Sequence, residues 1–193
     1  MPRGDEVKAG VSRVKLTYED LLKLPDDGLR HELIDGEHYV TPSPNIRHQA
    51  IAGNLHWIIR GFVEQNPGGR VFFAPLDILF SMFDVVEPDL LYVSAERLAV
   101  LADKNVQGAP DLVIEILSPS TRRTDETIKR RLYERFGVAE YWIVDPELET
   151  LKVYRRVDDS FRRAGDYALE TSDEFTTPLF PGLTLRLADV FTV

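Results

Sequence analysis

The chain has 193 residues, of which 44% are hydrophobic and 28% are charged, a composition typical of a folded globular domain and not of a disordered chain. It contains no cysteine, which excludes disulfide bonds and thiolate metal sites. The net charge of −9 argues against proteins that coat nucleic acid without specificity, because such proteins depend on a basic surface.

The amino terminus predicts a short leader followed by one domain. Residues 1–15 lack the apolar core of a signal peptide, and no apolar run reaches the roughly 18 residues of a membrane span. We therefore expect a flexible leader over residues 1–15, a single domain over residues 16–193, no membrane partner and a cytoplasmic location.

In chain order, the first third of the domain predicts a helix, a hairpin and a longer helix. The segment 16–25 holds a short helix that is capped by Thr17 and ends at Pro25. The hairpin covers 31–40 with a type I′ turn at Asp35-Gly36, and the long helix covers 46–65. The spacing of apolar residues in the long helix is helical, and we expect Trp57 to pack in the core.

Strands then alternate with helices. Strands are predicted over residues 71–74, 76–80, 89–93, 111–117 and 141–144, with helical segments over 95–101 and 125–136 and a peripheral β meander over 151–155, 161–169 and 183–187. Trp142 is a second expected core residue. This order predicts an α/β (α+β) domain, in which helices flank a mixed β-sheet that carries an N-terminal hairpin and a C-terminal meander.

Glu115 is the unusual residue of the strand over 111–117, because its neighbours are apolar. A lone buried charge costs several kcal/mol, so Glu115 must be neutralised, hydrogen-bonded or bound to a cation. Asp111 is on the same strand face but about 13 Å away, too far to share one ion, and a capping role at the start of the strand is expected for it.

A neighbouring strand is the better source of a second acid, since paired strands lie about 4.8 Å apart. The strand over 89–93 opens with Asp89, and the helix over 125–136 carries Lys129. Two carboxylates from adjacent strands, close to this helix, form a hard-oxygen site suited to Mg²⁺ or Mn²⁺. Phosphodiester hydrolysis needs such a site, because the metal acidifies a bound water that the lysine can position or deprotonate.

Five segments carry a family resemblance in the same order along the chain. They are ELIDGE (Glu32 to Glu37), Pro88-Asp89, GAPDLVIEILSPST (Gly108 to Thr121), the helix with Lys129, and FGVAEYWIVDP (Phe136 to Pro146). Together they resemble the Uma family of bacterial restriction endonucleases, whose fold is that of the PD-(D/E)XK nucleases. The resemblance extends from about Tyr18 to Val193, and it implies a restriction-endonuclease-like core, a divalent metal and cleavage of DNA.

The family motif can be carried over residue by residue. Asp89 matches the acid of "PD" and Glu115 the acid of "(D/E)", which implies that these two residues bind the metal. The lysine expected two residues after Glu115 is replaced by Leu117. The resemblance implies that Lys129 on the following helix substitutes for it and that Glu32 is an additional catalytic acid.

Other polar residues have two interpretations each. The segment 121–131 holds five bases and two acids, so Arg122, Arg123 and Arg130 are candidates to bind nucleic acid, although such runs are commonly solvated faces. Lys129 could equally be a solvated lysine paired with Asp125. His48, at the start of the long helix, could reach the site, but a capping or surface role is expected for it.

The sequence therefore predicts a metal-dependent DNA endonuclease that hydrolyses phosphodiester bonds. Because cutting a duplex needs two active sites or two visits, a homodimer is one expectation. The alternative is a module that binds nucleic acid or protein without cleaving it, suggested by the net charge of −9 and by Leu117. An arginine or lysine bound to both Asp89 and Glu115 would favour this alternative or a purely structural role.

Overall fold

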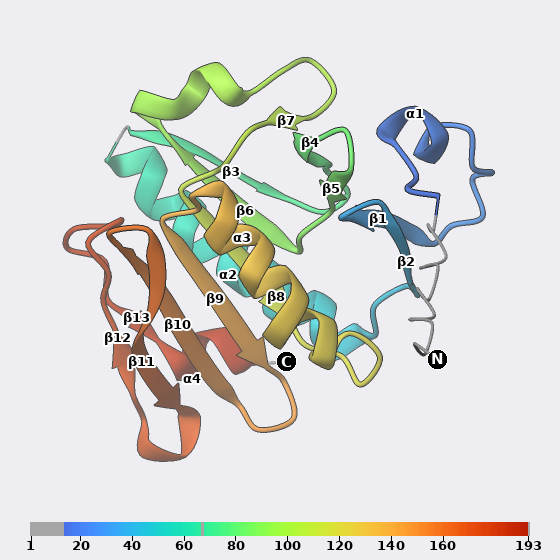
Figure 1. Ribbon diagram of the computed structural model, residues 1–193. Coiled ribbons are helices and arrows are strands. Elements are labelled where there is room, and N and C mark those ends of the chain that lie inside the picture. The colour runs from blue at the N-terminus through green and yellow to red at the C-terminus, as the bar shows by residue number, and fades with distance from the viewer. Residues whose placement is uncertain (1–13, 67, 193) are drawn as a thin grey trace, which may run out of the picture.

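The computed structural model describes residues 14–66 and 68–192, so the predicted leader lies outside the described residues except for its last two positions (Figure 1). The helical elements are α1 (Tyr18–Leu21), α2 (Ile46–Gln65), η1 (Ala95–Val100), η2 (Thr124–Lys129), α3 (Arg130–Phe136), η3 (Leu169–Thr171) and α4 (Leu187–Phe191). The strands are β1 (Arg30–Ile34), β2 (Glu37–Thr41), β3 (Gly69–Phe73), β4 (Ile78–Ser81), β5 (Asp84–Val86), β6 (Leu90–Ser94), β7 (Val106–Gln107), β8 (Leu112–Ile116), β9 (Glu140–Asp145), β10 (Thr150–Val157), β11 (Ser160–Ala168), β12 (Glu174–Phe175) and β13 (Leu185–Arg186). No helix in the described ranges is long and apolar enough to cross a membrane.

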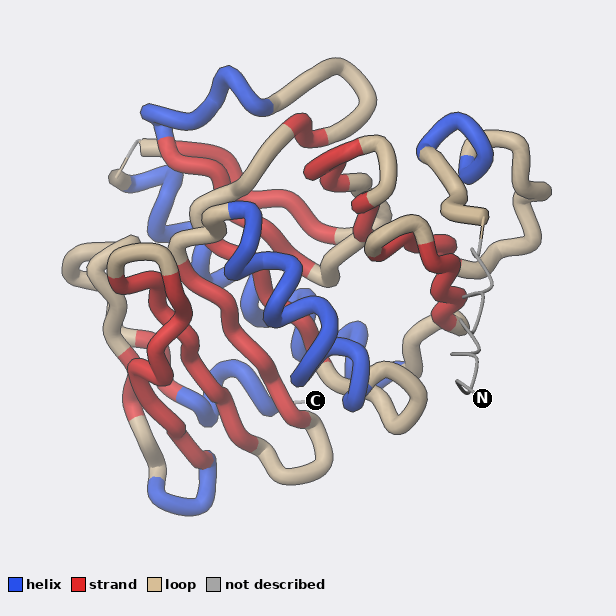
Figure 2. The backbone as a smooth tube through the Cα atoms, in the orientation of Figure 1, coloured by secondary structure: helices blue, strands red, loops and turns tan. Residues whose placement is uncertain are grey.

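The strands form two mixed sheets and a short ribbon (Figure 2). The larger sheet has the order β11-β10-β9-β8-β6-β3 and is parallel only between β8 and β9. The second sheet has the order β2-β1-β5-β4-β7, and β12 pairs with β13. The helices α2 and α3 lie on opposite faces of the six-stranded sheet (Figure 1). The predicted fold class, a mixed sheet flanked by helices, is confirmed.

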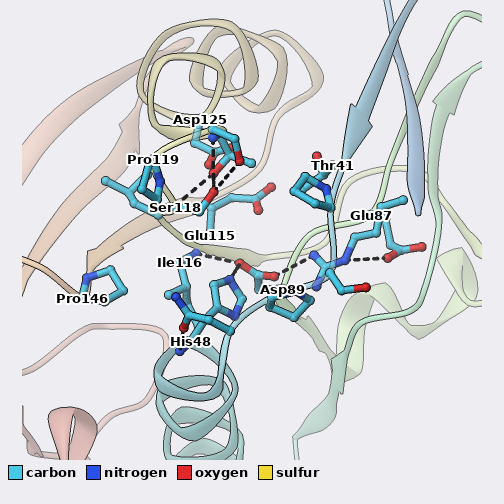
Figure 3. A pocket seen from close by; sticks show the side chains of 18 of the residues that line it. Thr41, His48, Glu87, Asp89, Glu115, Ile116, Ser118, Pro119, Asp125 and Pro146 are labelled. Carbon is cyan, nitrogen blue, oxygen red and sulfur yellow. Dashed lines mark hydrogen bonds and ion pairs between the residues drawn. The ribbon is translucent and has the colours of Figure 1, made fainter. Parts of the chain in front are cut away.

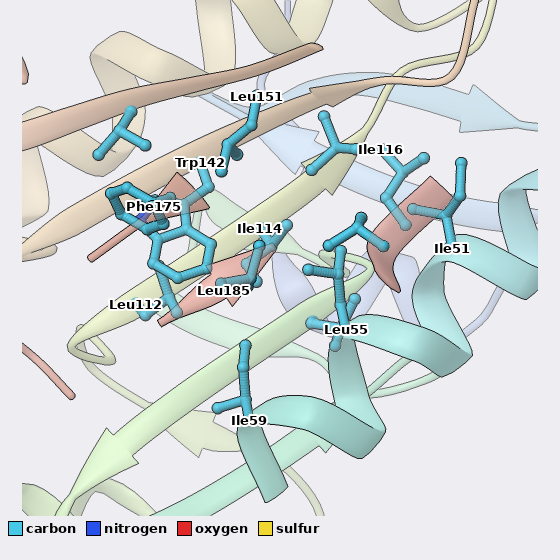
Figure 4. Close-up of a cluster of buried hydrophobic side chains, with 14 of the residues drawn as sticks. Ile51, Leu55, Ile59, Leu112, Ile114, Ile116, Trp142, Leu151, Phe175 and Leu185 are labelled. Atoms are coloured by element: carbon cyan, nitrogen blue, oxygen red, sulfur yellow. The ribbon is translucent and has the colours of Figure 1, made fainter. Parts of the chain in front are cut away.

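One face of the six-stranded sheet packs against α2 (Figure 4). Alternation along β8 turns Leu112, Ile114 and Ile116 toward this face, where they meet apolar side chains of α2 such as Leu55. Trp142 of β9 is fully buried in the same cluster. Burial of each large apolar side chain contributes about 1.5–3 kcal/mol, so this core fixes the position of β8.

The opposite face packs against α3 and the five-stranded sheet. Val113 of β8 and Leu117, which directly follows β8, belong to this second core, together with Leu132 and Tyr133 of α3. Glu115 is the β8 residue between Val113 and Leu117 on this face, and it is buried. The alternation that builds the two cores therefore also places a carboxylate inside the protein, at the C-terminal end of β8.

Most local predictions hold. Asn45 caps α2, Thr17 caps α1, and Asp35 and Gly36 both have positive φ angles (54° and 75°), as a type I′ turn requires. The meander differs from the prediction, because β10 and β11 extend the main sheet and residues 187–191 form a helix. The prediction for Trp57 is wrong: its side chain is 78% exposed on the outer face of α2.

Candidate active site

A cavity of about 380 Å³ opens where the end of β8 meets β1, the start of α2 and the η2–α3 helix (Figure 3). We call it the acidic cavity, because six carboxylates line it and only three side chains there carry a fixed positive charge. The acids are Glu32, Glu87, Asp89, Glu115, Asp125 and Glu147, and the bases are Arg30, Arg47 and Lys129. The lining also includes His48, Ile116, Leu117, Pro146 and the two segments over residues 41–45 and 118–121.

Asp89 lies directly beside the end of β8. The antiparallel register pairs Leu90 with Ile114, so the residue before β6 falls next to Glu115. The Asp89 carboxylate accepts hydrogen bonds from Arg30 Nη1 at 2.7 Å and from the backbone N–H of Ile116 at 2.8 Å, and His48 Nε2 lies 3.1 Å from it. Burial alone would raise the pKa of Asp89, but His48 and Arg30 outweigh it and hold that pKa below its usual value.

Glu115 accepts two hydrogen bonds on the same oxygen, Oε1. Lys129 Nζ donates at 3.0 Å and the Tyr133 hydroxyl at 2.7 Å. Burial raises the pKa of Glu115 well above its usual value, and the charges of Asp125, Asp89 and Glu32 add to this, whereas Lys129 opposes it. Glu115 is therefore a carboxylate whose surroundings disfavour its negative charge.

Of the three bases that line the cavity, Lys129 is the most deeply buried, with 5% of its side chain exposed against 19% for Arg30 and 44% for Arg47. Its Nζ lies 2.8 Å from Glu32 Oε1, 3.0 Å from Glu115 Oε1 and 3.7 Å from Asp125 Oδ1. Burial alone would lower the pKa of Lys129, but Glu115, Glu32 and Asp125 raise it well above its usual value. Lys129 is thus a buried cation, and the alternative of a solvated lysine is excluded, although the pairing with Asp125 is present.

Lys129 reaches inward from an unusual helical turn. The segment η2 is π-helical, a rare turn in which the backbone bonds run from residue i to i+5. Asp125 and Lys129 are its buried residues, and α3 continues the buried face with Leu132 and Tyr133. The helix thus presents an acid, a lysine and a tyrosine in succession to the end of β8.

The cavity is short of positive charge. Burial raises the pKa of Glu87 to about 7 and that of Asp125 to about 6. The Oδ1 atom of Asp125 is buried and accepts no hydrogen bond.

Among the described residues, no three histidine or acidic side chains are grouped so that they alone could hold a metal. Mg²⁺, however, commonly takes only one or two protein carboxylates and keeps its waters, so this donor set fits a divalent cation.

Comparison with known proteins identifies the family. The family model Uma2, described as "Putative restriction endonuclease", matches residues 18–188. The chain belongs to the Uma2 family. It also resembles a solved structure, a putative nuclease of the DUF820 family from Anabaena variabilis, with a TM-score of 0.76 and 26% identity over 91% of this chain and 97% of that one. Among curated proteins, no sequence matches the chain. Family and fold together support a nuclease, for which DNA is the implied substrate.

The structure of this Uma2 protein brings four of the predicted site residues together. Glu32, Asp89, Glu115 and Lys129 all line the acidic cavity. Their chemical roles remain predictions. Asp111 lies outside the cavity and accepts a hydrogen bond from the backbone N–H of Ser94 at 2.7 Å, in keeping with the capping role expected for it.

The three arginines predicted to bind nucleic acid do not line the cavity. Arg122 is held by Asp145 at 2.5 Å, and the guanidinium of Arg130 lies over the Tyr154 ring at 5.1 Å from its centroid. Arg123, the residue before η2, is exposed. Phosphate binding by these three residues stays a prediction, with less support than for the cations inside the cavity.

The sequence did not point to several residues that line the cavity or support its acids. Arg30 is on the same face of β1 as Glu32, so the two-residue period of a strand could have predicted it. Tyr133 follows Lys129 by four residues, so the period of a helix could have predicted it as well. The capping role expected for His48 is not what its side chain does. His48 lies in the first turn of α2, its backbone N–H donates to the Asn45 cap, and its side chain is buried against Asp89. No local pattern indicates which element this end of α2 meets.

Proposed function

We propose that this Uma2 protein is a metal-dependent DNA endonuclease that hydrolyses phosphodiester bonds. The observation that carries the proposal is the placement of Asp89 and Glu115 on neighbouring strands of the acidic cavity, with the buried Lys129 3.0 Å from Glu115. The surplus of carboxylates over bases there supports a bound cation.

Asp89 and Glu115 would hold Mg²⁺ or Mn²⁺, which when bound withdraws charge from the phosphate and acidifies a water. Lys129 acts as a cation, since its acidic neighbours raise its pKa, and it therefore orients water or phosphate by donating hydrogen bonds instead of accepting a proton. Glu32 positions the Lys129 ammonium at 2.8 Å, and His48 and Arg30 keep Asp89 ionised. Arg47, on the cavity wall, supplies a further positive charge for the DNA backbone.

A non-cleaving binding module on the same fold is the second candidate. It is favoured by one observation, that each of the two acids already has a basic partner: Arg30 contacts Asp89, and Lys129 contacts Glu115. No single arginine or lysine in the described part of the chain bridges both, so a site for an added cation remains compatible with the geometry.

The test is cleavage of supercoiled plasmid and of single-stranded DNA with Mg²⁺, Mn²⁺ or EDTA, comparing the wild type with Glu115→Ala. Metal-dependent cleavage that the variant lacks is the expected result. The matched control is Glu140→Ala, which removes another buried glutamate of the same sheet outside the cavity and should leave cleavage intact.

Calorimetric titration with Mn²⁺ separates the two candidate functions. The endonuclease requires Mn²⁺ binding that disappears in Glu115→Ala. Folded wild-type protein that neither binds Mn²⁺ nor cuts either substrate would support the binding module. Equal cleavage by wild type and Glu115→Ala would place the active site elsewhere.

A further inference from the structure

The two edges of the six-stranded sheet differ in how they are protected. At one edge, β11 carries Arg162, Arg163 and Asp166, with an ion pair between the last two, and the β10–β11 ladder is interrupted by a register shift after Val153. Charges and bulges of this kind prevent an edge from pairing with another chain. The other edge, β3, has the sequence Gly-Arg-Val-Phe-Phe, regular pairing with β6 and a single charge.

In the described part of the chain, the outward backbone groups of Val71 and Phe73 on β3 make no hydrogen bond, whereas the outward C=O of Gly69 accepts one from Arg70 Nη1 at 3.1 Å. The N–H of Ala74 bonds to Asp89 and the C=O of Gly68 bonds to Ala95, so even-numbered residues turn toward β6. Because an antiparallel ladder alternates, the N–H and C=O groups of Val71 and Phe73 point away from the sheet. β3 is the last strand in the order of this sheet, and the Phe73 side chain is 57% exposed.

From these observations we propose that β3 pairs with β3 of a second copy of this chain, joining the two six-stranded sheets around a two-fold axis. An antiparallel register with Val71 opposite Val71 pairs Gly69 of each copy with Phe73 of the other. In this register, each residue whose backbone N–H and C=O groups point away from its own sheet pairs with a residue of the same kind in the other copy. A two-fold interface requires this pairing. Phe73 then lies beside the Tyr92 ring that covers Gly69 of the other copy, an aromatic contact that removes an exposed phenylalanine from water.

Charge on the adjoining surface favours a protein partner over nucleic acid. A groove of about 570 Å³ runs between β3 and α2, and its α2 wall carries Arg60 and Glu64, which pair at 2.8 Å. A two-fold axis at Val71 turns the α2 walls of the two copies toward each other. Arg60 of each copy can then pair with Glu64 of the other copy. A surface for single-stranded nucleic acid needs a clear excess of positive charge, whereas this groove carries Arg60 and Arg70 against Glu64, an excess of one, in a chain of net charge −9.

The proposal does not depend on the nuclease activity, and its first test uses neither DNA nor metal. Sedimentation velocity of the full chain over a range of concentrations should show a species of twice the 22.0 kDa chain mass. Phe73→Lys, which places a charge on the edge, should shift the protein to monomer. Leu148→Lys is the matched control, because Leu148 is a similarly exposed apolar residue (66%) away from β3 and should leave the dimer unchanged. Circular dichroism shows whether both variants are folded.

Amide hydrogen exchange of the wild type gives a second readout that needs no variant. In the dimer, the amides of Val71, Phe72 and Phe73 are all protected, whereas in a monomer only Phe72 is, because its N–H faces β6. Dilution should therefore deprotect Val71 and Phe73 and leave Phe72 protected. A wild type that is monomeric at all concentrations overturns the proposal, as does a dimer in which Val71 and Phe73 exchange rapidly. A monomer whose affinity for single-stranded DNA changes in Phe73→Lys would instead identify β3 as a nucleic-acid surface.

Discussion

Two buried glutamates stand in neighbouring strands of the six-stranded sheet, Glu115 in β8 and Glu140 in β9, and their surroundings differ. Glu140 faces the α2 side, where Arg155 Nε lies 2.5 Å from Oε1, Thr177 Oγ1 donates to the same oxygen at 2.8 Å, and Trp142 Nε1 donates to Oε2 at 2.8 Å. Glu140 thus has its own cation and a donor on each oxygen, as a structural buried acid should.

Glu115 faces the other side of the sheet, and its single basic contact, Lys129, also serves Glu32 and Asp125. Both of its hydrogen bonds fall on one oxygen, and its pKa is raised well above the usual value, chiefly by burial. A sheet can hold a buried acid in a fully paired setting, as at Glu140. The incomplete pairing at Glu115 is therefore a property of the acidic cavity, of the kind found at functional sites.

The largest expected effect comes from removing the shared cation. Lys129→Met leaves Glu32, Glu115 and Asp125 buried without their positive partner, and breaking a buried ion pair typically costs about 3–5 kcal/mol. Urea denaturation of the metal-free protein should show a loss of that size. Lys152→Met is the control, because Lys152 makes one partly exposed ion pair with Glu126 and should cost under about 1 kcal/mol. Equal losses in the two variants would contradict the assignment of Lys129 as the cation of three acids.

The two glutamates should separate activity from stability. Glu115→Gln should lower the rate of DNA cleavage by about 100-fold or more, since metal-ion stabilisation of the transition state is worth several kcal/mol, with little loss of folding stability. Glu140→Gln should do the opposite, keeping cleavage and losing about 1–3 kcal/mol of stability, because Arg155 and Trp142 lose their carboxylate. Plasmid cleavage and urea denaturation of both variants measure this, and a shared loss of activity would show that both acids act only through folding.

Prediction from sequence succeeded where the pattern is local or follows from strand pairing. The neighbourhood of Asp89 and Glu115 could be predicted because two apolar strands each carry one acid and paired strands are close together. The contacts of His48 and Arg30 with Asp89 could not, since they depend on where α2 and β1 meet β6 in three dimensions. Trp57 was misplaced because apolar character predicts burial only on average, and α2 buries the face that carries Ile51, Leu55 and Ile59.

The acidic cavity should also make the folding stability depend on pH. Burial raises the pKa of Glu87 to about 7 and of Asp125 to about 6, so the folded protein holds protons that the unfolded chain releases. The stability of the metal-free protein should therefore fall as pH rises from about 4 through 7, by at most about 1.4 kcal/mol per pH unit for each proton. Asp125→Asn should flatten this slope, because it removes one of the two carboxyl groups whose pKa is raised. If the stability of the wild type rises over this pH range, the predicted pH dependence is wrong.

The smallest effect concerns the hydroxyl that supports Glu115. Tyr133 donates to Glu115 Oε1 at 2.7 Å, and its pKa, raised mainly by burial, keeps it protonated as a donor. Tyr133→Phe should cost about 1 kcal/mol, a typical hydrogen bond, and should make Glu115 still harder to ionise. Tyr141→Phe is a close control, because Tyr141 is equally buried and its ring centroid lies 4.9 Å from that of Tyr133. The Tyr141 hydroxyl, however, donates to the backbone C=O of Asp125 at 3.1 Å and not to Glu115. Both variants should lose similar stability, yet the carboxyl resonance of Glu115, followed by NMR against pH, should titrate higher only in Tyr133→Phe. An unchanged titration would mean that Tyr133 fills space beside Glu115 without supporting its charge, leaving Lys129 as the one group that does.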